Sequence, residues 1–203
     1  MSPRIVDKEA KKNQIIHAAL QVFAKNGIAK SKMIDIADAA GVGKGTIYEY
    51  FRSKEDIFAE AYQAMFAGMS EMLEKALSET DDPRKKLDSL INISLNFFGH
   101  DSRDFAAVMM DFWAEGVRTK NEKMIELIDL KQIYKEYRDL IGAIVQEGIN
   151  RGIFKKTDVQ SYAAIIIAAL DGIFLQMIID PQIIDIEKIK KSFSENIFSG
   201  ILK

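Results

Sequence analysis

Proline is scarce in this chain, and its scarcity constrains the fold more than any other feature of the sequence. The 203 residues contain three prolines, Pro3, Pro83 and Pro181. Two long stretches therefore run without the residue that most strongly breaks a helix. Along residues 57–76 apolar side chains recur at intervals of three and four, which is the spacing of one helix face. The sequence predicts an all-α protein.

Glycine, proline and short polar runs divide the chain into about nine predicted helices. Ser53, which precedes a lysine and two acidic residues, is predicted to cap one helix, and Asp82 with Pro83 to start another. The breaks are expected at residues 27, 41–43, 53, 81–83, 99–102, 116–121, 152–158 and 180–181.

The composition excludes several classes of site. Hydrophobic residues make up 48% and charged residues 29% of the chain, which is typical of a globular protein. Cysteine is absent and histidine occurs twice, so thiolate nucleophiles, iron–sulfur clusters and cysteine zinc sites are excluded, and we expect no cofactor. No spacing places a general acid beside a base and no nucleophile motif occurs, so we expect no enzymatic activity.

No targeting or membrane segment is predicted. The first residues are charged where a signal peptide would be apolar. The longest apolar stretch, residues 163–179, is shorter than the roughly 20 residues that span a bilayer, and it contains Asp171. We expect this stretch to be a buried helix of a cytoplasmic protein that does not bind a membrane.

Charge is divided unevenly along the chain. Residues 1–55 contain ten Lys and Arg against six Asp and Glu, although the whole chain has a net charge of −2. This balance does not favour a general polyanion binder, but it allows a local one near the N-terminus.

Residues 33–51 have the pattern of a helix-turn-helix. Two short amphipathic helices flank Gly41, which permits the positive φ that ends the first helix. The second helix would turn Ile47 inward and show Lys44, Thr46 and Tyr48 to solvent, together with the backbone at Gly45. These groups suit contacts with base edges and phosphates. The alternative interpretation is an ordinary helical hairpin with a solvated face.

Residues 10–58 resemble the DNA-binding domain of the TetR (tetracycline repressor) family. The resemblance rests on Ile36-Ala37, Ala40-Gly41-Val42, Lys44-Gly45-Thr46-Ile47-Tyr48, Tyr50-Phe51, Ser53-Lys54-Glu55 and Ile57, which match the family's signature in order. Gly43, Lys32 and Glu49 depart from the residues that are frequent in the family. The role of Glu49 stays open.

The resemblance implies a specific set of DNA contacts and a two-domain organisation. Lys44, Gly45, Thr46 and Tyr48 would face the major groove and its edges, Tyr50 and Lys54 would hold phosphates, and Ser31 and Lys32 would lie against the DNA backbone. Residues 1–53 would form a three-helix DNA-binding domain. Residues 54–203 would form a helical domain for ligand binding and dimerisation.

Methionine and aromatic side chains in the C-terminal part are interpreted as an adaptable pocket for an apolar or aromatic small molecule. Five polar residues lie on mostly apolar stretches, where each is expected to serve as a capping, surface or dimer-contact residue or else to orient a ligand's polar end: His100, Asp111, Glu115, Asp171 and Gln176. The expected ligand-binding residues are Phe66, Met69, Phe97, Met110, Trp113, Tyr137, Phe174 and Met177.

The last two predicted helices are expected to form the contact of a homodimer, because residues 163–179 are apolar nearly all round. The sequence thus predicts a regulator, most readily a repressor, that a small-molecule effector releases from a palindromic double-stranded DNA operator. The competing interpretation is a small-molecule binding or helical interaction protein that does not bind DNA.

Overall fold

The computed structural model describes the whole chain except residues 1–7, 98–102, 120–125, 127, 181 and 183–184. Over the described residues the chain forms nine α-helices and one isolated bridge between Phe154 and Leu202. The all-α prediction is confirmed.

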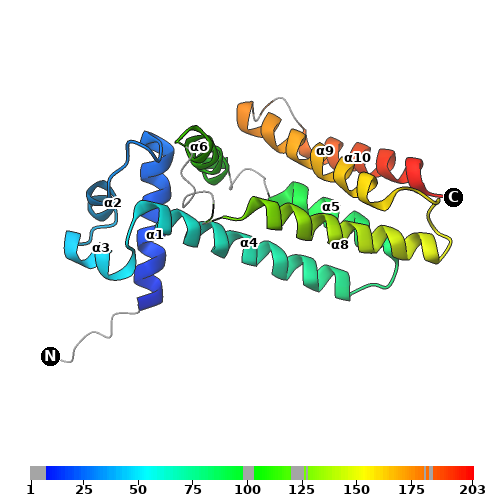
Figure 1. Cartoon of the computed structure of the whole chain (residues 1–203), viewed down its shortest axis with the longest axis horizontal. Helices are drawn as coiled ribbons and strands as arrows, with labels where there is room; N and C mark the ends of the chain where they lie inside the picture. The colour runs from blue at the N-terminus through cyan, green and yellow to red at the C-terminus, as the bar shows by residue number, and fades with distance from the viewer. Residues whose placement is uncertain (1–7, 98–102, 120–125, 127, 181, 183–184) are drawn as a thin grey trace. The chain divides into compact units, whose positions relative to one another are not determined.

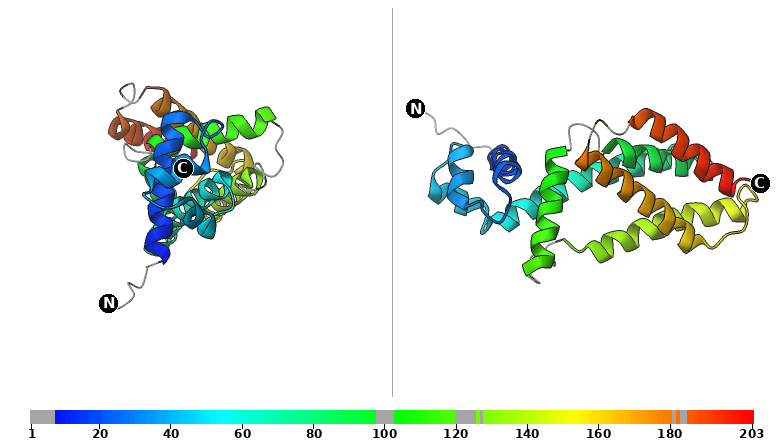
Figure 2. Two further views of the ribbon diagram at one scale, coloured as in Figure 1. Left: turned by 90° about the vertical axis from the view of Figure 1, so that its left-hand side faces the viewer. Right: turned by 90° about the horizontal axis from the view of Figure 1, so that it is seen from above.

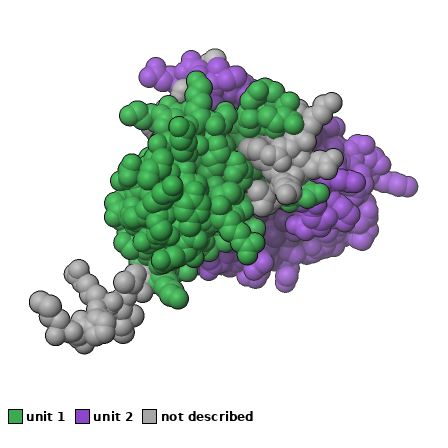
Figure 3. Space-filling model, turned by 60° about the vertical axis from the view of Figure 1, so that its left-hand side comes forward, with its two compact units in different colours: residues 1–66, 104–128 green, residues 67–103, 129–203 purple. Residues whose placement is uncertain are grey.

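The chain is organised in two compact units (Figure 3). The first contains Met1–Phe66 and Asp104–Ile128, and the second contains Ala67–Arg103 and Asp129–Lys203. The predicted boundary after residue 53 separates a DNA-binding domain from a ligand-binding domain, whereas these two units are defined by which residues pack together. That boundary therefore stays a prediction.

The first unit is built around three N-terminal helices, α1 (Lys8–Asn26), α2 (Met33–Ala39) and α3 (Lys44–Tyr50). It also contains the first part of α4 (Lys54–Ser78) and almost all of α6 (Arg103–Thr119) (Figure 1). Aromatic packing joins the last two helices, because the rings of Phe58 and Phe112 stack with centroids 4.3 Å apart. The core consists of fully or nearly fully buried apolar side chains, including Ile15, Ala19, Phe23, Ile28, Ile36, Ile47, Phe51 and Phe58.

The second unit is a helical bundle. Its helices are the end of α4, α5 (Pro83–Phe97), α8 (Leu130–Asn150), α9 (Val159–Ile179) and α10 (Ile186–Ile201). α8 packs against both α5 and α9, and α10 packs against α5. Figure 2 shows the helices of this unit from two further directions. Leu87, Leu90, Ile91, Ile141 and Val145 are buried in the core of this bundle.

Local capping sets the predicted helix starts. The Ser53 hydroxyl accepts a hydrogen bond from the Asp56 N–H at 3.1 Å, and Asp82 Oδ1 accepts one from the Arg84 N–H at 2.9 Å. Each bond satisfies a backbone donor that has no partner inside the helix. Both predicted starts are confirmed.

Helix α9 fills the interval between two predicted breaks and is longer than the apolar stretch of residues 163–179 within it. It contains 21 residues and begins at Val159, so the argument that the apolar stretch is too short to span a bilayer is wrong. By length and composition it is the one helix among the described residues that could cross a membrane. Ala163, Ile166, Ile167, Leu170 and Phe174 are nevertheless buried within the second unit.

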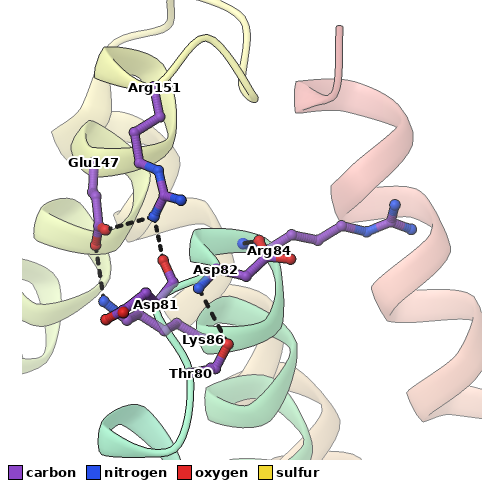
Figure 4. A network of polar contacts seen from close by, with 7 residues as sticks. All are labelled: Thr80, Asp81, Asp82, Arg84, Lys86, Glu147 and Arg151. Carbon is purple, nitrogen blue, oxygen red and sulfur yellow. Dashed lines mark hydrogen bonds and ion pairs between the residues drawn. The ribbon is translucent and has the colours of Figure 1, made fainter.

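A polar network joins the start of α5 to the end of α8 (Figure 4). The Lys86 ammonium lies 3.0 Å from Glu147 Oε2, and the Arg151 guanidinium lies 3.2 Å from Glu147 Oε1. Arg151 also donates to the backbone carbonyl of Asp81. The network fixes the loop before α5 against the C-terminal turn of α8.

Candidate nucleic-acid interface and effector pocket

The turn between α2 and α3 is a helix end closed by glycine. Gly41 has a φ of 62°, a left-handed conformation that glycine adopts without steric cost. The Gly41 N–H donates to the Asp38 carbonyl at 3.1 Å, and the Val42 N–H donates to the Ala37 carbonyl at 2.9 Å. This pair of bonds satisfies carbonyls at the end of α2 and turns the chain into α3.

Helix α3 has one buried and one exposed face. Ile47 is fully buried, whereas Tyr48 is 49% exposed. Lys44 and Gly45 are also exposed, and Thr46 and Tyr50 are partly exposed. A Cβ atom added at Gly45 would meet no atom within 4 Å, so another molecule can approach the backbone there. The flank predicted to face DNA is thus brought together on one solvent-accessible helix.

The residues predicted to contact the DNA backbone before α2 have different environments. Ser31 is 3% exposed, and its hydroxyl donates to the Gly27 carbonyl at 2.7 Å. The Lys32 side chain is exposed, and its backbone N–H donates to Asp35 Oδ2 at 2.9 Å.

Lys54 holds the turn that precedes α2. Its ammonium donates to the carbonyl oxygens of Ile28, Ala29 and Ser31 at 2.5, 3.1 and 3.0 Å. Sequence reasoning missed this internal role, because the bonds join residues 23 to 26 positions apart in the chain. The predicted phosphate contacts of Ser31, Lys32 and Lys54 stay predictions.

Asp111 of α6 supports the same turn. Its Oδ2 atom accepts a hydrogen bond from the Ile28 N–H at 2.6 Å. The sequence had left ligand orientation and capping open for this residue, and the structure shows a capping contact next to Gly27, whose φ is 75°. Side chains from α4 and α6 therefore both hold the turn between α1 and α2.

The second unit contains a small apolar hollow between α5 and α9. Phe174 and Met177, two of the predicted ligand-binding residues, lie in its wall, and a third, Tyr137, hydrogen bonds to Ser94, which also lines it. The full lining is Ser94, Leu95, Leu170, Ile173, Phe174 and Met177.

The other predicted ligand-binding residues are not in this wall. Met69 and Phe97 belong to the second unit, whereas Phe66, Met110 and Trp113 belong to the first. The Phe66 ring stacks on that of Tyr62, Met110 is 41% exposed, and the side chain of Trp113 lies outside the described part of the structure. Their predicted contacts with an effector stay predictions.

Polar side chains from three helices are linked to Ser94, the polar member of the wall of the hollow, or lie near it on the exposed side of the unit. Tyr137 of α8 shares a short hydrogen bond with Ser94 of α5, and the Tyr134 hydroxyl of α8 donates to Asp171 Oδ2 of α9 at 2.8 Å. Sequence reasoning missed Ser94 and the pairing of Tyr134 with Asp171, since these partners come from different helices. We call Ser94, Tyr134, Tyr137 and Asp171 the polar cluster.

Burial perturbs the acid–base behaviour of the polar cluster. Burial, and then the hydrogen bond and charge of Asp171, raise the pKa of Tyr134 to about 12. Burial also raises the pKa of Tyr137, to which the charge of Asp171 contributes, and it raises the pKa of Asp171 itself. Both phenols therefore keep their protons at neutral pH. Among the described residues no group of three or more His, Asp or Glu side chains is placed to hold a metal ion.

Two family models match the chain. The model described as "Bacterial regulatory proteins, tetR family" matches residues 15–61, which include α2, α3 and the start of α4. The model described as "BetI-type transcriptional repressor, C-terminal" matches residues 83–197, which include most of the second unit.

Individual proteins are similar along nearly the whole chain. The fatty acid metabolism regulator protein of Bacillus subtilis is 29% identical over 195 residues, which are 96% of this chain and 97% of the relative. The crystal structure of the transcriptional regulator FadR from Bacillus subtilis in complex with stearoyl-CoA superposes with a TM-score of 0.74 at 29% identity, covering 93% of this chain and 98% of that one. The fatty acid degradation regulator FadR from Bacillus halodurans superposes with a TM-score of 0.72 at 26% identity, covering 94% and 95%.

Proposed function

The chain belongs to the TetR family of bacterial transcriptional regulators, and from that premise we propose that it is a repressor that binds a palindromic operator through two copies of α3. As a member of this family it is a DNA-binding regulator that responds to a small molecule. The proposal concerns which residues contact the DNA, how two chains pair, and which effector releases them.

The exposed flank of α3 carries the proposal. Ile47 anchors the helix in the core, so the opposite flank stays in solvent and is held rigidly. Tyr48 presents a hydroxyl that can donate to a phosphate, and Lys44 presents three ammonium protons to phosphates or base edges. An open backbone at Gly45 allows the helix to lie deep in a major groove.

An apolar stripe on α9 supports a homodimer through the last two helices. Ile165, Leu175 and Ile179 are 61%, 42% and 75% exposed, and the small residues Ala168 and Gly172 lie between them on the same face. Exposing an apolar stripe of this kind to water is unfavourable, and covering it with a second copy of the chain stabilises the dimer. Two-fold symmetry then presents two copies of α3 to one DNA duplex.

The hollow in the second unit is apolar but small, about 10 Å³ or the room of one water molecule, so the apolar part of an effector would enter it only by pushing the wall side chains apart. FadR from Bacillus subtilis, 29% identical, was crystallised with stearoyl-CoA, an amphiphile with a long hydrocarbon chain. We extend the long hydrocarbon chain of that ligand, and not its head group, to the effector of this chain. The effector would favour a conformation in which the two copies of α3 no longer fit one operator, and a differential affinity of about 1–3 kcal/mol is sufficient for such coupling. We further propose that the protein acts in the cytoplasm and has no enzymatic activity.

Replacing Tyr48 with alanine tests the DNA contact. A DNA duplex selected from a random pool by the wild-type protein serves as the operator, and fluorescence anisotropy at fixed salt measures the dissociation constant. We expect Tyr48→Ala to weaken binding by about 1–3 kcal/mol, or roughly 5- to 150-fold, because a groove and phosphate contact is lost.

Met72→Ala is the matched control for this substitution, because Met72 is also 49% exposed and lies on α4 in the second unit. It should bind the operator as the wild type does. Unchanged operator binding by Tyr48→Ala would contradict the assignment of Tyr48 to the DNA interface, and failure of the wild type to select any duplex would contradict the proposed operator recognition.

A further inference from the structure

The hydroxyl groups of the polar cluster all donate their protons to hydrogen bonds within the protein. Ser94 is 4% exposed, and its hydroxyl donates to the Leu90 carbonyl at 2.7 Å. A hydroxyl has a single proton, so Ser94 has none left for Tyr137. In the hydrogen bond that joins the two side chains, Tyr137 is therefore the donor and Ser94 the acceptor.

The second hydrogen bond of the cluster uses the remaining hydroxyl proton. Tyr134 donates to Asp171 Oδ2 at 2.8 Å. The protons of Ser94, Tyr134 and Tyr137 thus all lie in bonds between protein atoms. What the cluster offers to another molecule is oxygen lone pairs and the negative charge of Asp171.

A ligand group that fits such a surface must supply the proton. Hydroxyl, amide and ammonium groups donate hydrogen bonds to lone pairs, and an ammonium also gains from the charge of Asp171. A carboxylate only accepts hydrogen bonds and carries the same charge as Asp171, so its desolvation beside the cluster would be uncompensated.

The neighbouring wall determines the rest of the ligand. Five of the six lining residues, Leu95, Leu170, Ile173, Phe174 and Met177, are apolar, and the flexible side chain of Met177 can adjust to an entering chain. An alkyl chain that displaces these side chains and enters the hollow would bring its head group next to Ser94, the polar member of the wall.

We infer that the polar cluster selects effectors whose apolar chain ends in a neutral or cationic hydrogen-bond donor, and that it rejects free carboxylates. This inference rests on the proposed function, which assigns the effector to the second unit. It goes further, because it assigns the head-group chemistry to Asp171 and the Tyr137–Ser94 pair.

Isothermal titration calorimetry without DNA, using four compounds that share a ten-carbon chain, each below its micelle concentration, tests the inference. Decylammonium and decan-1-ol donate hydrogen bonds, whereas methyl decanoate has no donor and decanoate is an anion. We expect decylammonium to bind at least about tenfold more tightly than decanoate, since a hydrogen bond to a charged group is worth this factor or more. We also expect decan-1-ol to bind more tightly than methyl decanoate, which separates hydrogen-bond donation from charge.

Asp171→Asn keeps the shape of the side chain and removes its charge. In this variant the dissociation constants of decylammonium and decanoate should differ by no more than about threefold. A merely structural role of Asp171 would not change this preference. Asp139→Asn is the control, because it removes a carboxylate that is exposed and paired with Lys135 on α8, and it should keep the wild-type ratio.

Equal or tighter binding of decanoate to the wild type would overturn the inference, as would an unchanged ratio in Asp171→Asn or no binding of any of the four compounds. None of these outcomes alters the operator measurement on Tyr48→Ala. Failure of the inference and failure of DNA recognition are therefore distinguishable.

Discussion

A single glycine in α8 determines how the chain leaves that helix. The carbonyl of Gly148 accepts hydrogen bonds from the N–H groups of Ile153 and Phe154 at 2.9 and 3.1 Å. The fully buried Phe154 ring lies directly on the glycine, where an added Cβ would be 2.0 Å from the ring atom Cδ2. No larger residue fits at this position without moving the ring.

Gly148→Ala should lower the free energy of unfolding by about 1–3 kcal/mol, because it forces a methyl group into an occupied part of the core. Gly68→Ala on α4 is the matched control, since a Cβ there meets no atom within 4 Å, and alanine should stabilise the helix by roughly 0.5–1 kcal/mol. Urea unfolding measured by circular dichroism compares the two. Equal stabilities would show that Phe154 does not pack on Gly148.

At the scale of helices, Glu147 lies at the centre of the contact between α5 and α8. Hydrogen bonding from Lys86, with a further contribution from Arg151, lowers the pKa of Glu147 below its ordinary value of 4.5. A carboxyl group whose pKa is lower in the folded state stabilises the fold above its unfolded pKa, and this stabilisation is lost as the pH falls through the folded pKa.

Glu147→Gln should therefore lower the Tm at neutral pH, and its difference from the wild type should shrink as the pH falls below 4.5. Thermal unfolding over a pH series measures this difference. Asp139→Asn, whose partner Lys135 is exposed, should change the Tm little at any pH. A difference for Glu147→Gln that persists undiminished in acid would contradict the assigned role of the carboxylate.

Helix ends were predictable from the sequence, whereas the partners of polar side chains were not. Ser53 caps α4 by accepting a hydrogen bond from the N–H of Asp56, three positions away. Such a local bond can be recognised from the spacing of residues in the sequence. Lys54, Asp111 and Tyr137 bond to residues that are 23 or more positions away. Their partners depend on how helices pack, so the sequence alone indicated neither the support of the turn before α2 nor the hydrogen bonds that join the polar cluster, although Tyr137 and Asp171 were expected near a ligand. The exposed flank of α3 could be predicted because Ile47 and Phe51 follow helical periodicity.

At the scale of the whole molecule, DNA recognition depends on two chains. The net charge of −2 gives little general attraction to DNA, so affinity must come from specific contacts made twice. Within one chain, the proposed DNA-contacting flank lies on α3 in the first unit and the proposed dimer stripe on α9 in the second. The 25-residue helix α4 contributes residues to both units. We therefore expect effector binding in the second unit to act on the geometry of the pair of chains.

Hydroxyl-radical footprinting of the selected operator, with wild-type protein and with Ile165→Glu, tests this pairing most directly. For the wild type we predict two symmetric protected half-sites with centres about 34–36 Å apart, one turn of DNA, or a multiple of it. Ile165→Glu places a charge in the apolar stripe and should weaken dimerisation and operator protection at least about tenfold. A single asymmetric protected segment, or full protection by Ile165→Glu, would contradict the binding of one duplex by two copies of α3 joined through α9.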